Sequence, residues 1–299
     1  QNPVLAGSYL LVPQGAAGLA VLDVSNGMNP VQVGSLEGTA TTILAVSSDG
    51  NTAYATDGTA RVWALNLSDK IHPSVIAGST YTPAAPVTAL AFKGTTLYVG
   101  TTAGVEVVSY ASAISPMLLK ALPAVGSRGV EALKIFVHPA YPQITFLVTA
   151  EGDAVQLLDV SGSTNPPGYE YYAVDHVSFA PYGDNEATGS LDCKYIATNG
   201  PYLYALDAPP ADLVNYIWPT SYLRPIYAKP NLGTFPATIT LTTDGTTPFW
   251  TDHGTQWNPS YESWMGLENV QSGVLVTGME QGSAIGTIDV GTNTLSPAW

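Results

Sequence analysis

Cysteine, positive charge and long apolar runs are all scarce in this sequence of 299 residues. The single cysteine, Cys193, excludes an internal disulfide framework, and we expect a small buried side chain there rather than a nucleophile. No run approaches the roughly 18 apolar residues that a membrane-spanning helix needs. Nine lysine and arginine residues against 23 aspartate and glutamate residues give a net charge of −14. Because such a charge repels phosphate backbones and anionic lipids, we predict neither nucleic-acid binding nor membrane insertion.

Helix-forming patterns are equally scarce. Charged residues make up only 11% of the chain, and the apolar spacing i, i+3, i+4, i+7 of amphipathic helices is missing. The chain has instead 29 glycines and 23 prolines, which is typical of many short strands joined by tight turns. Hydrophobic residues reach 45%, enough for a core and too many for a disordered chain. Together these features predict an all-β protein.

A short apolar motif recurs along the chain. The stretch GLAVLDVSNGMNPVQVGSL at 18–36 is apolar on both faces for six residues before it reaches a turn, and VQLLDV at 155–160 repeats its centre. Weaker copies occur at other points, and the residues at the aspartate position of successive copies are 43, 43, 50, 48 and 82 residues apart. These residues are Asp23, Asn66, Ser109, Asp159, Asp207 and Asp289.

The last interval covers two periods, and a second motif locates the copy hidden within it. SSDGNTAYATDGT at 47–59 matches TTDGTTPFWTDHGT at 242–255, with both aspartates of each stretch aligned. Seven repeats of 41–50 residues then account for nearly the whole chain. A fixed period of this size is typical of solenoids, propellers and arrays.

Each repeat contains four short apolar runs separated by turns, which predicts four antiparallel strands. Radial repetition of such sheets makes a β-propeller, in which neighbouring sheets bury both faces of the central strands. This explains why LAVLDV has no polar face. We predict one domain, 1–299, with seven blades of four strands, and six or eight blades as alternatives. The expected blades are 1–37, 38–84, 85–125, 126–172, 173–220, 235–263 and 264–299, with a proline-rich insertion at 219–236.

The repeats resemble those of known propeller families. LAVLDVSNGMNPVQVGSL resembles the LVIVD repeat, and SSDGNTAYATDG resembles the YVTN and surface-layer-type repeats. The resemblance covers about four of the seven repeats and implies the propeller fold. Because those families include extracellular adhesive and surface-layer proteins, it also implies an exported structural or adhesive role.

The first repeat begins at a second-strand position. Residues 7–14, GSYLLVPQ, align with second strands such as TAYAT, and only QNPVLA precedes them. The last repeat already contains four strand-like runs and offers no spare strand. We therefore expect an incomplete first blade, either three-stranded or loosely paired with NPVLA, or completed by a neighbouring molecule. The last alternative predicts a homo-oligomer or filament joined through QNPVLA or TLSPAW at the two ends.

Recognisable catalytic motifs are missing. The four histidines form no metal-binding spacing, and His72 and His138 precede prolines, which favours ordinary loop positions. Lactonase-like propellers place metal-binding carboxylates near the innermost strands, and the comparable positions here are Glu131, Asp175 and Glu268. Hard oxygen ligands would suit Ca²⁺. The competing interpretation, that these residues cap strand ends, is favoured because other repeats have threonine and valine there. We predict no catalytic residue, no required cofactor and no enzyme activity.

Aromatic residues gather in the second half of the chain. Exposed tyrosine and tryptophan suit protein interfaces and sugar surfaces, whereas packing at blade edges is the alternative. The predicted interaction residues are Tyr222, Tyr227, Trp257, Tyr261 and Trp264.

The sequence as a whole predicts a non-catalytic extracellular propeller used for surface interaction or self-assembly. A metal-dependent hydrolase and a carbohydrate-binding propeller are the alternatives. Because the chain does not start with methionine, we expect a cleaved secretory signal. One N-glycosylation sequon, Asn66-Leu67-Ser68, is compatible with export.

Overall fold

A computed structural model describes most of the first 178 residues and individual strands beyond them. The described residues are 3–47, 49–178, 193–199, 202–207, 222–231, 238–243, 249–250, 264–270, 273–279, 282–289 and 294–298. They form strands, turns and one 3₁₀ turn at Gly162–Thr164. Among them, no helix is long and apolar enough to cross a membrane. The chain divides into two compact units, Gln1–Pro123 and Ala124–Trp299.

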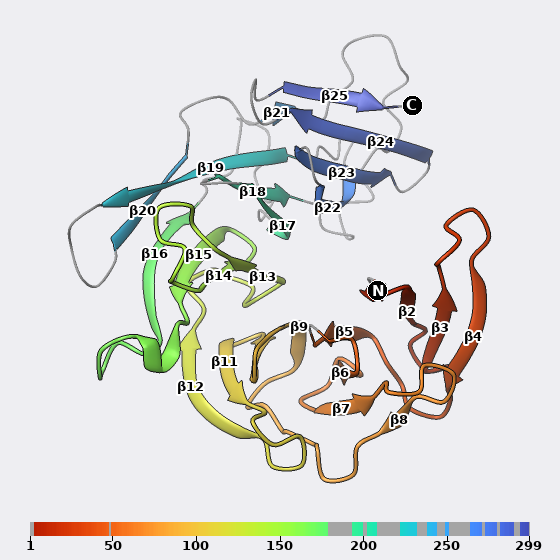
Figure 1. The fold of residues 1–299 in the computed structure, drawn as a ribbon. Helices are drawn as coiled ribbons and strands as arrows, with labels where there is room; N and C mark the ends of the chain where they lie inside the picture. Colours follow the sequence, from red (N-terminus) through yellow and green to blue (C-terminus); the bar gives the residue numbers. More distant parts are fainter. Residues whose placement is uncertain are drawn as a thin grey trace. The chain divides into compact units, whose positions relative to one another are not determined.

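The first unit consists of three four-stranded antiparallel sheets, each built from consecutive strands (Figure 1). The first sheet contains β1 (Val4–Ala6), β2 (Tyr9–Pro13), β3 (Leu19–Asp23) and β4 (Val31–Leu36). The second contains β5 (Ile43–Val46), β6 (Thr52–Thr56), β7 (Val62–Asn66) and β8 (Ser74–Val75). The third contains β9 (Val87–Lys93), β10 (Thr96–Thr101), β11 (Gly104–Ser109) and β12 (Met117–Pro123).

The second unit contains three further antiparallel sheets. The fourth sheet is made of β13 (Ala132–Phe136), β14 (Phe146–Ala150), β15 (Ala154–Asp159) and β16 (Tyr172–Ser178). The fifth has β17 (Cys193–Asn199), β18 (Tyr202–Asp207), β19 (Tyr222–Asn231) and β20 (Thr238–Thr243), and β21 (Phe249–Trp250) also pairs with β19. The sixth has β22 (Trp264–Val270), β23 (Gly273–Met279), β24 (Gly282–Asp289) and β25 (Thr294–Ala298).

The described residues therefore form six sheets, one fewer than the seven repeats predict. The predicted insertion at 219–236 contains β19, a ten-residue strand with β18 on one side and β20 and β21 on the other. The sequence predicts an insertion here rather than a strand because the segment contains Pro225 and Pro230, and proline is unusual within a paired strand. Strands expected in separate blades thus share the fifth sheet. The number of blades stays a prediction, with the six-bladed alternative matching the described sheets.

The first sheet has four strands, so a three-stranded blade and a blade completed by a neighbouring molecule are both wrong, whereas the alternative in which NPVLA pairs with the blade is confirmed. Val4 pairs with Leu11 and Ala6 with Tyr9, which makes β1 a three-residue first strand. Only Gly7 and Ser8 separate the two strands, and Gly7 has φ of +66°. Because such a tight hairpin turn needs only two residues, the short segment before β2 suffices for both a strand and its turn. The slot that would accept a neighbour's strand is filled by the chain itself.

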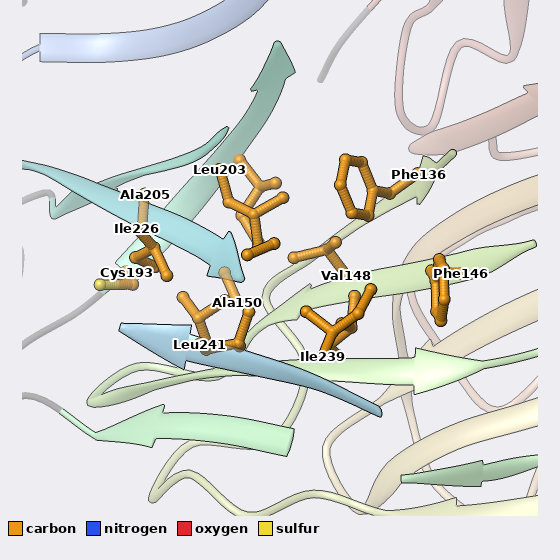
Figure 2. Close-up of a cluster of buried hydrophobic side chains, with 14 of the residues drawn as sticks. Phe136, Phe146, Val148, Ala150, Cys193, Leu203, Ala205, Ile226, Ile239 and Leu241 are labelled. Atoms are coloured by element: carbon orange, nitrogen blue, oxygen red, sulfur yellow. The ribbon is translucent and has the colours of Figure 1, made fainter. Parts of the chain in front are cut away.

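The central strands are buried on both faces, as the apolar repeats predict. In β3, Leu19, Ala20 and Val21 are all buried, and every residue of β15 is buried. Between the fourth and fifth sheets, Figure 2 shows Phe136, Phe146 and other side chains packing in one apolar cluster. Its further labelled members are Val148, Ala150, Cys193, Leu203, Ala205, Ile226, Ile239 and Leu241. The buried position of Cys193 confirms the expectation for this residue.

The polar residue that marks each repeat closes a turn at the end of the third strand. In four repeats its side-chain oxygen accepts a hydrogen bond from the backbone N–H two residues later, at 2.8–3.3 Å. The backbone N–H of the residue directly after the marker residue donates to a carbonyl oxygen in the turn between the first and second strands of the same sheet. Only a short side chain with an acceptor oxygen makes this bond, which explains the choice of residue. The four are Asp23, Asn66, Ser109 and Asp159.

Candidate interaction surface

The three predicted metal candidates occupy non-equivalent positions. Glu131 directly precedes β13, Glu268 lies within β22, and Asp175 lies within β16, the fourth strand of its sheet. The lactonase comparison predicts Asp175 near an innermost strand, whereas its Oδ2 accepts a hydrogen bond from the Leu241 N–H at 2.7 Å. Its carboxylate thus joins β16 to β20 of the fifth sheet. In the part of the chain that the structure describes, no three His, Cys, Asp or Glu residues are grouped to hold a metal ion.

The buried carboxylate of Glu151 binds backbone groups of a neighbouring segment. Glu151 follows β14 and is fully buried. Its Oε2 accepts hydrogen bonds from the N–H groups of Val125 and Gly126 at 2.6 and 2.9 Å, and its Oε1 accepts one from the Thr149 hydroxyl at 2.6 Å. A Cβ on Gly126 would lie 2.0 Å from the Glu151 carbonyl oxygen, so this approach requires glycine. The carboxylate holds the segment that leads into the fourth sheet.

Glu106 in β11 has the corresponding role in the first unit. Its carboxylate accepts a hydrogen bond from the Tyr81 hydroxyl at 2.6 Å and another from the Ala84 N–H at 2.9 Å. Burial, together with the bond to Glu106, raises the pKa of Tyr81 well above its usual value. The tyrosine is therefore a neutral donor at physiological pH. The interaction fixes the connection between the second and third sheets.

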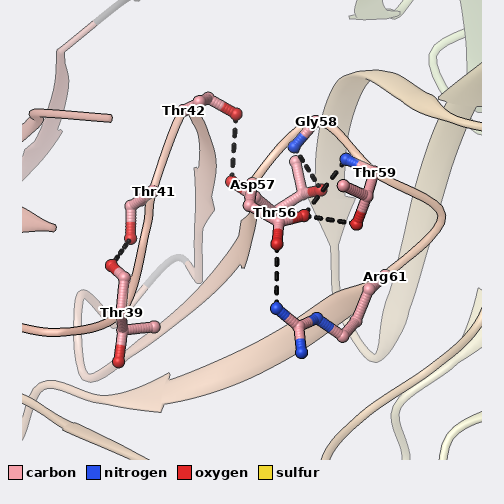
Figure 3. A network of polar contacts seen from close by, with 8 residues as sticks. All are labelled: Thr39, Thr41, Thr42, Thr56, Asp57, Gly58, Thr59 and Arg61. Atoms are coloured by element: carbon pink, nitrogen blue, oxygen red, sulfur yellow. Dashed lines mark hydrogen bonds and ion pairs between the residues drawn. The ribbon is translucent and has the colours of Figure 1, made fainter. Parts of the chain in front are cut away.

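Asp57 forms a polar network at the turn between β6 and β7 (Figure 3). Its carboxylate accepts hydrogen bonds from the backbone and hydroxyl of Thr59 and pairs with Arg61 Nη2 at 2.8 Å. The Arg61 guanidinium also lies over the Trp63 ring, 5.1 Å from its centroid. A cation that is already paired and stacked is a turn element rather than an available binding group.

His138 lies in the loop after β13, as its neighbouring proline predicts, but its side chain is buried. Its Nδ1 accepts a hydrogen bond from the Ala140 N–H at 3.0 Å, and its Nε2 lies 2.9 Å from the Ala228 carbonyl oxygen. Nε2 must therefore carry the proton and donate it, which makes the ring neutral. Burial lowers the pKa of His138, and the bond to Ala228 opposes this in part. The ring joins the fourth sheet to β19.

The predicted aromatic interaction residues fall where side chains are not described. Tyr222 and Tyr227 belong to β19 and Trp264 begins β22, but only their backbones lie within the described residues. Trp257 and Tyr261 lie outside the described residues. Their role in binding stays a prediction.

The outer strand β12 carries a surface that the sequence analysis missed. Its residues 117–121 are all exposed, including Met117, Leu118 and Leu119 at 59, 47 and 37%. Ile114, in the turn before the strand, is 64% exposed. The signal was the apolar run MLLKALP, which periodicity alone cannot assign to a buried or an exposed strand.

Among the described residues, no strand pairs with the outer side of β12, which leaves an open strand edge. β12 pairs with β11 and is the terminal strand of the third sheet. The pairing has an irregularity between Val107 and Val108, opposite Leu119. Strand edges are normally protected by charge, bulges or proline. Here protection is limited to this bulge, Lys120 and the terminal Pro123, beside an otherwise apolar run.

The third sheet also differs in charge from the rest of this acidic chain. Between positions 70 and 123 the only acidic residue is Glu106, which is buried. The strands of the sheet carry two lysines, Lys93 and Lys120. The chain as a whole has a net charge of −14. The strands of the third sheet thus carry no exposed carboxylate.

Comparisons with known proteins identify the fold. No family model matches the chain, and no curated protein matches its sequence. The β-propeller domain of Cps50 (Swd1) from Myceliophteria thermophila matches with a TM-score of 0.58 and 13% identity, over 99% of this chain and 88% of that one. U3-55K matches with 0.55 and 15%, over 98% and 77%. Saccharomyces cerevisiae Sqt1 matches with 0.56 and 11%, over 97% and 81%.

The chain therefore has an all-β propeller fold with four-stranded antiparallel blades, which confirms the predicted fold class. Identities of 11–15% show the fold alone. Membership of an LVIVD-type or YVTN-type family stays a prediction.

Proposed function

We propose that this β-propeller is a non-catalytic, exported structural subunit that associates with copies of itself through the outer edge of β12. The observation that carries the proposal is the run of five consecutive exposed residues, three of them large and apolar, on an open strand edge. The engagement of Glu106, Glu151 and Asp175 in backbone hydrogen bonds supports a non-catalytic role.

An open strand edge can bind another extended strand through its unpaired backbone groups. Alternate backbone N–H and C=O groups of an edge strand point outward and pair with a second strand. Apolar side chains that face each other across such a pair contribute about 0.2–1 kcal/mol per pair. Burial of Met117, Leu118 and Leu119 would also remove large apolar surfaces from water.

A second copy of the chain is the partner that best fits this edge. Two β12 strands related by a two-fold axis run antiparallel, so each edge is complementary to the other without any further segment. Two chains of net charge −14 repel each other, so a contact without exposed carboxylates costs less electrostatic free energy than one that brings acidic residues together. The strands of the third sheet, which carry no exposed carboxylate, lessen that repulsion at the contact.

This contact differs from the terminal-strand exchange that the sequence suggests. β1 occupies the first position of its sheet, so the amino-terminal segment has no empty slot to fill. A two-fold β12 pair closes as a dimer, and a filament would need a second contact on each copy. Imaging of the assembled protein distinguishes the two forms.

Export is the second part of the proposal, and composition supports it. The chain has nine cationic residues, an acidic balance and one cysteine, which is buried. Fractionation of the native cells tests this part separately, with the protein expected outside the cytosol. Recovery in the cytosol alone would contradict it.

The test of self-association is sedimentation of purified protein over a range of concentrations. Wild type is expected to shift from monomer to dimer or larger species, and Leu118→Lys to remain monomeric because a charge replaces the central apolar contact. Val31→Lys is the matched control, since Val31 is 51% exposed on β4, the outer strand of the first sheet. Its association should equal that of wild type.

The proposal fails if wild type remains monomeric at every concentration. It also fails if Leu118→Lys and Val31→Lys affect association equally, because the contact would then not depend on β12. Circular dichroism of the two variants verifies that both retain the wild-type fold.

A further inference from the structure

The turn after β7 presents an acceptor for a covalent modification. We propose that Asn66 is an N-glycosylation site, in which its side-chain amide nitrogen receives a glycan from a lipid-linked sugar pyrophosphate. The inference rests on the export part of the proposed function and is independent of association through β12.

The sequence contains one stretch with the required pattern. Asn66-Leu67-Ser68 is the sole Asn-x-Ser or Asn-x-Thr in the chain whose middle residue is not proline. Asn66 is the last residue of β7 and is exposed, as is Ser68. Leu67 between them is fully buried. The buried leucine anchors the turn, so both polar residues are held at the surface.

The hydrogen bonds of the turn leave the reactive atom available. Asn66 Oδ1 accepts hydrogen bonds from the Ser68 N–H at 2.9 Å and from the Ser68 hydroxyl at 2.8 Å. Both bonds use the amide oxygen, and no described residue bonds to Nδ2 of Asn66. The serine of the sequon thus orients the amide, and the nitrogen stays accessible.

Transfer of the glycan to this nitrogen forms one bond and breaks one bond at the sugar. Nδ2 attacks C1 of the donor sugar and forms a C1–N bond, while the bond between C1 and the pyrophosphate oxygen breaks. The lipid pyrophosphate leaves with the electron pair, and the proton lost by the amide passes to a base of the transferase. No oxidant or metal of this chain takes part.

Equivalent turns in other repeats show that the fold does not need an asparagine here. Asp23 and Asp159 make the same hydrogen bond to the N–H of a serine two residues later, at 2.8 and 2.9 Å. A carboxylate therefore closes the turn as well as an amide. What distinguishes Asn66 from Asp23 and Asp159 is the amide nitrogen, which takes no part in the hydrogen bonds that close the turn.

The experiment is secretion of the full chain behind a signal sequence from a eukaryotic host, followed by intact mass before and after treatment with a peptide N-glycosidase. Wild type should carry the mass of one glycan, which the enzyme removes. Asn66→Asp and Ser68→Ala should lose it, and Ser68→Thr should keep it. Because aspartate already closes this turn in the first and fourth repeats, Asn66→Asp is expected to fold and be secreted.

A variant with a second sequon provides a control for the role of the turn. Asp23→Asn creates the sequon Asn-Val-Ser on the equivalent turn of the first repeat. We expect this variant to carry two glycans. Absence of the second glycan would contradict the argument that this turn presents the acceptor.

An unmodified wild type secreted alongside a glycosylated reference protein would overturn the proposal. So would a glycan that persists in Asn66→Asp. Neither result bears on sedimentation of unglycosylated protein, which tests association separately. Recovery of the native protein in the cytosol would contradict export, while the secretion experiment would still report whether Asn66 is an acceptor.

Discussion

At the scale of single residues, the buried carboxylates of this propeller hold backbone segments in place. Fully buried Glu151 accepts hydrogen bonds from two backbone N–H groups and from the buried Thr149 hydroxyl, so its carboxylate oxygens find their partners within the fold. Such groups resemble active-site residues in composition and burial. The difference lies in the bonds, since every described acceptor interaction of Glu151 is made within the fold.

Removal of the Glu151 carboxylate should destabilise the protein. Glu151→Ala leaves the N–H groups of Val125 and Gly126 and the buried Thr149 hydroxyl without their charged acceptor, and hydrogen bonds to charged groups contribute about 1.5–3 kcal/mol each. We expect the free energy of unfolding in urea to fall by roughly 3 kcal/mol or more. Glu37→Ala is the control, because Glu37 is exposed and should change stability by less than about 0.5 kcal/mol. Equal effects would contradict the structural role of Glu151.

His138 should make stability depend on pH. Burial lowers its pKa in the folded state, whereas the unfolded chain binds the proton near pH 6.5. Below about pH 6.5 the unfolded state therefore binds more protons, so the free energy of unfolding falls as pH falls. His138→Gln should lessen this dependence. Identical pH profiles for wild type and His138→Gln would contradict the account.

Some residue roles follow from the sequence and others do not. The repeat alignment identifies Asp23, Asn66, Ser109 and Asp159, because one turn geometry imposes one kind of side chain at a fixed position. The burial of His138 is not predictable, because its partner, Ala228, is 90 positions away and belongs to another sheet. The partner of the Asp175 carboxylate, Leu241, is also remote, 66 positions away.

At the scale of elements, apolar runs predict the central strands. The remaining strands depend on the length and residues of the turns and loops that join them. The sequence leaves the pairing of β1 undecided, because only a two-residue turn with a glycine at positive φ leaves room for a three-residue strand. β19 is missed because two prolines suggest an insertion. Its partners β18 and β20 are the strands before and after it in the chain, but the register across the connecting segments cannot be read from a single sequence.

Close approach between sheets requires glycine at one position of β4. A Cβ on Gly34 would lie 2.5 Å from the Lys70 carbonyl oxygen and 2.6 Å from that of Ile71. Backbone atoms cannot move aside without cost, so Gly34→Ala should lower the free energy of unfolding by about 1–3 kcal/mol. Gly27→Ala is the matched control, since nothing lies within 4 Å of a Cβ there. Thermal unfolding of both variants tests this, and an unchanged Gly34→Ala would refute it.

At the scale of the whole molecule, the fold is predictable from periodicity, and the surface is not. Seven repeats of similar length indicate stacked four-stranded sheets regardless of sequence identity, which is why propellers only 11–15% identical share the fold. The β12 surface is exposed because this apolar run forms the outermost strand of its sheet. Which run becomes the outermost strand is set by strand order within the sheet and cannot be read from composition.

Charge gives a second test of association through β12. Two copies of net charge −14 repel each other, and the proposed contact contains no exposed carboxylates to form ion pairs. Raising ionic strength from about 0.01 to 0.15 M shortens the Debye length from about 30 to 8 Å and screens this repulsion. Association measured by sedimentation should therefore strengthen with salt. Weakening with salt would indicate a contact between lysines of one copy and acidic residues of another.

Amide hydrogen exchange tests the central claim most directly, because it reports on the β12 edge itself. Those N–H groups of Met117–Pro123 that do not bond to β11 are open in the monomer and should exchange rapidly in dilute solution. At concentrations where the protein associates, we predict slower exchange at these amides, with β4 unchanged. Exchange at β12 that stays equally rapid in monomer and assembly would contradict self-association through this edge.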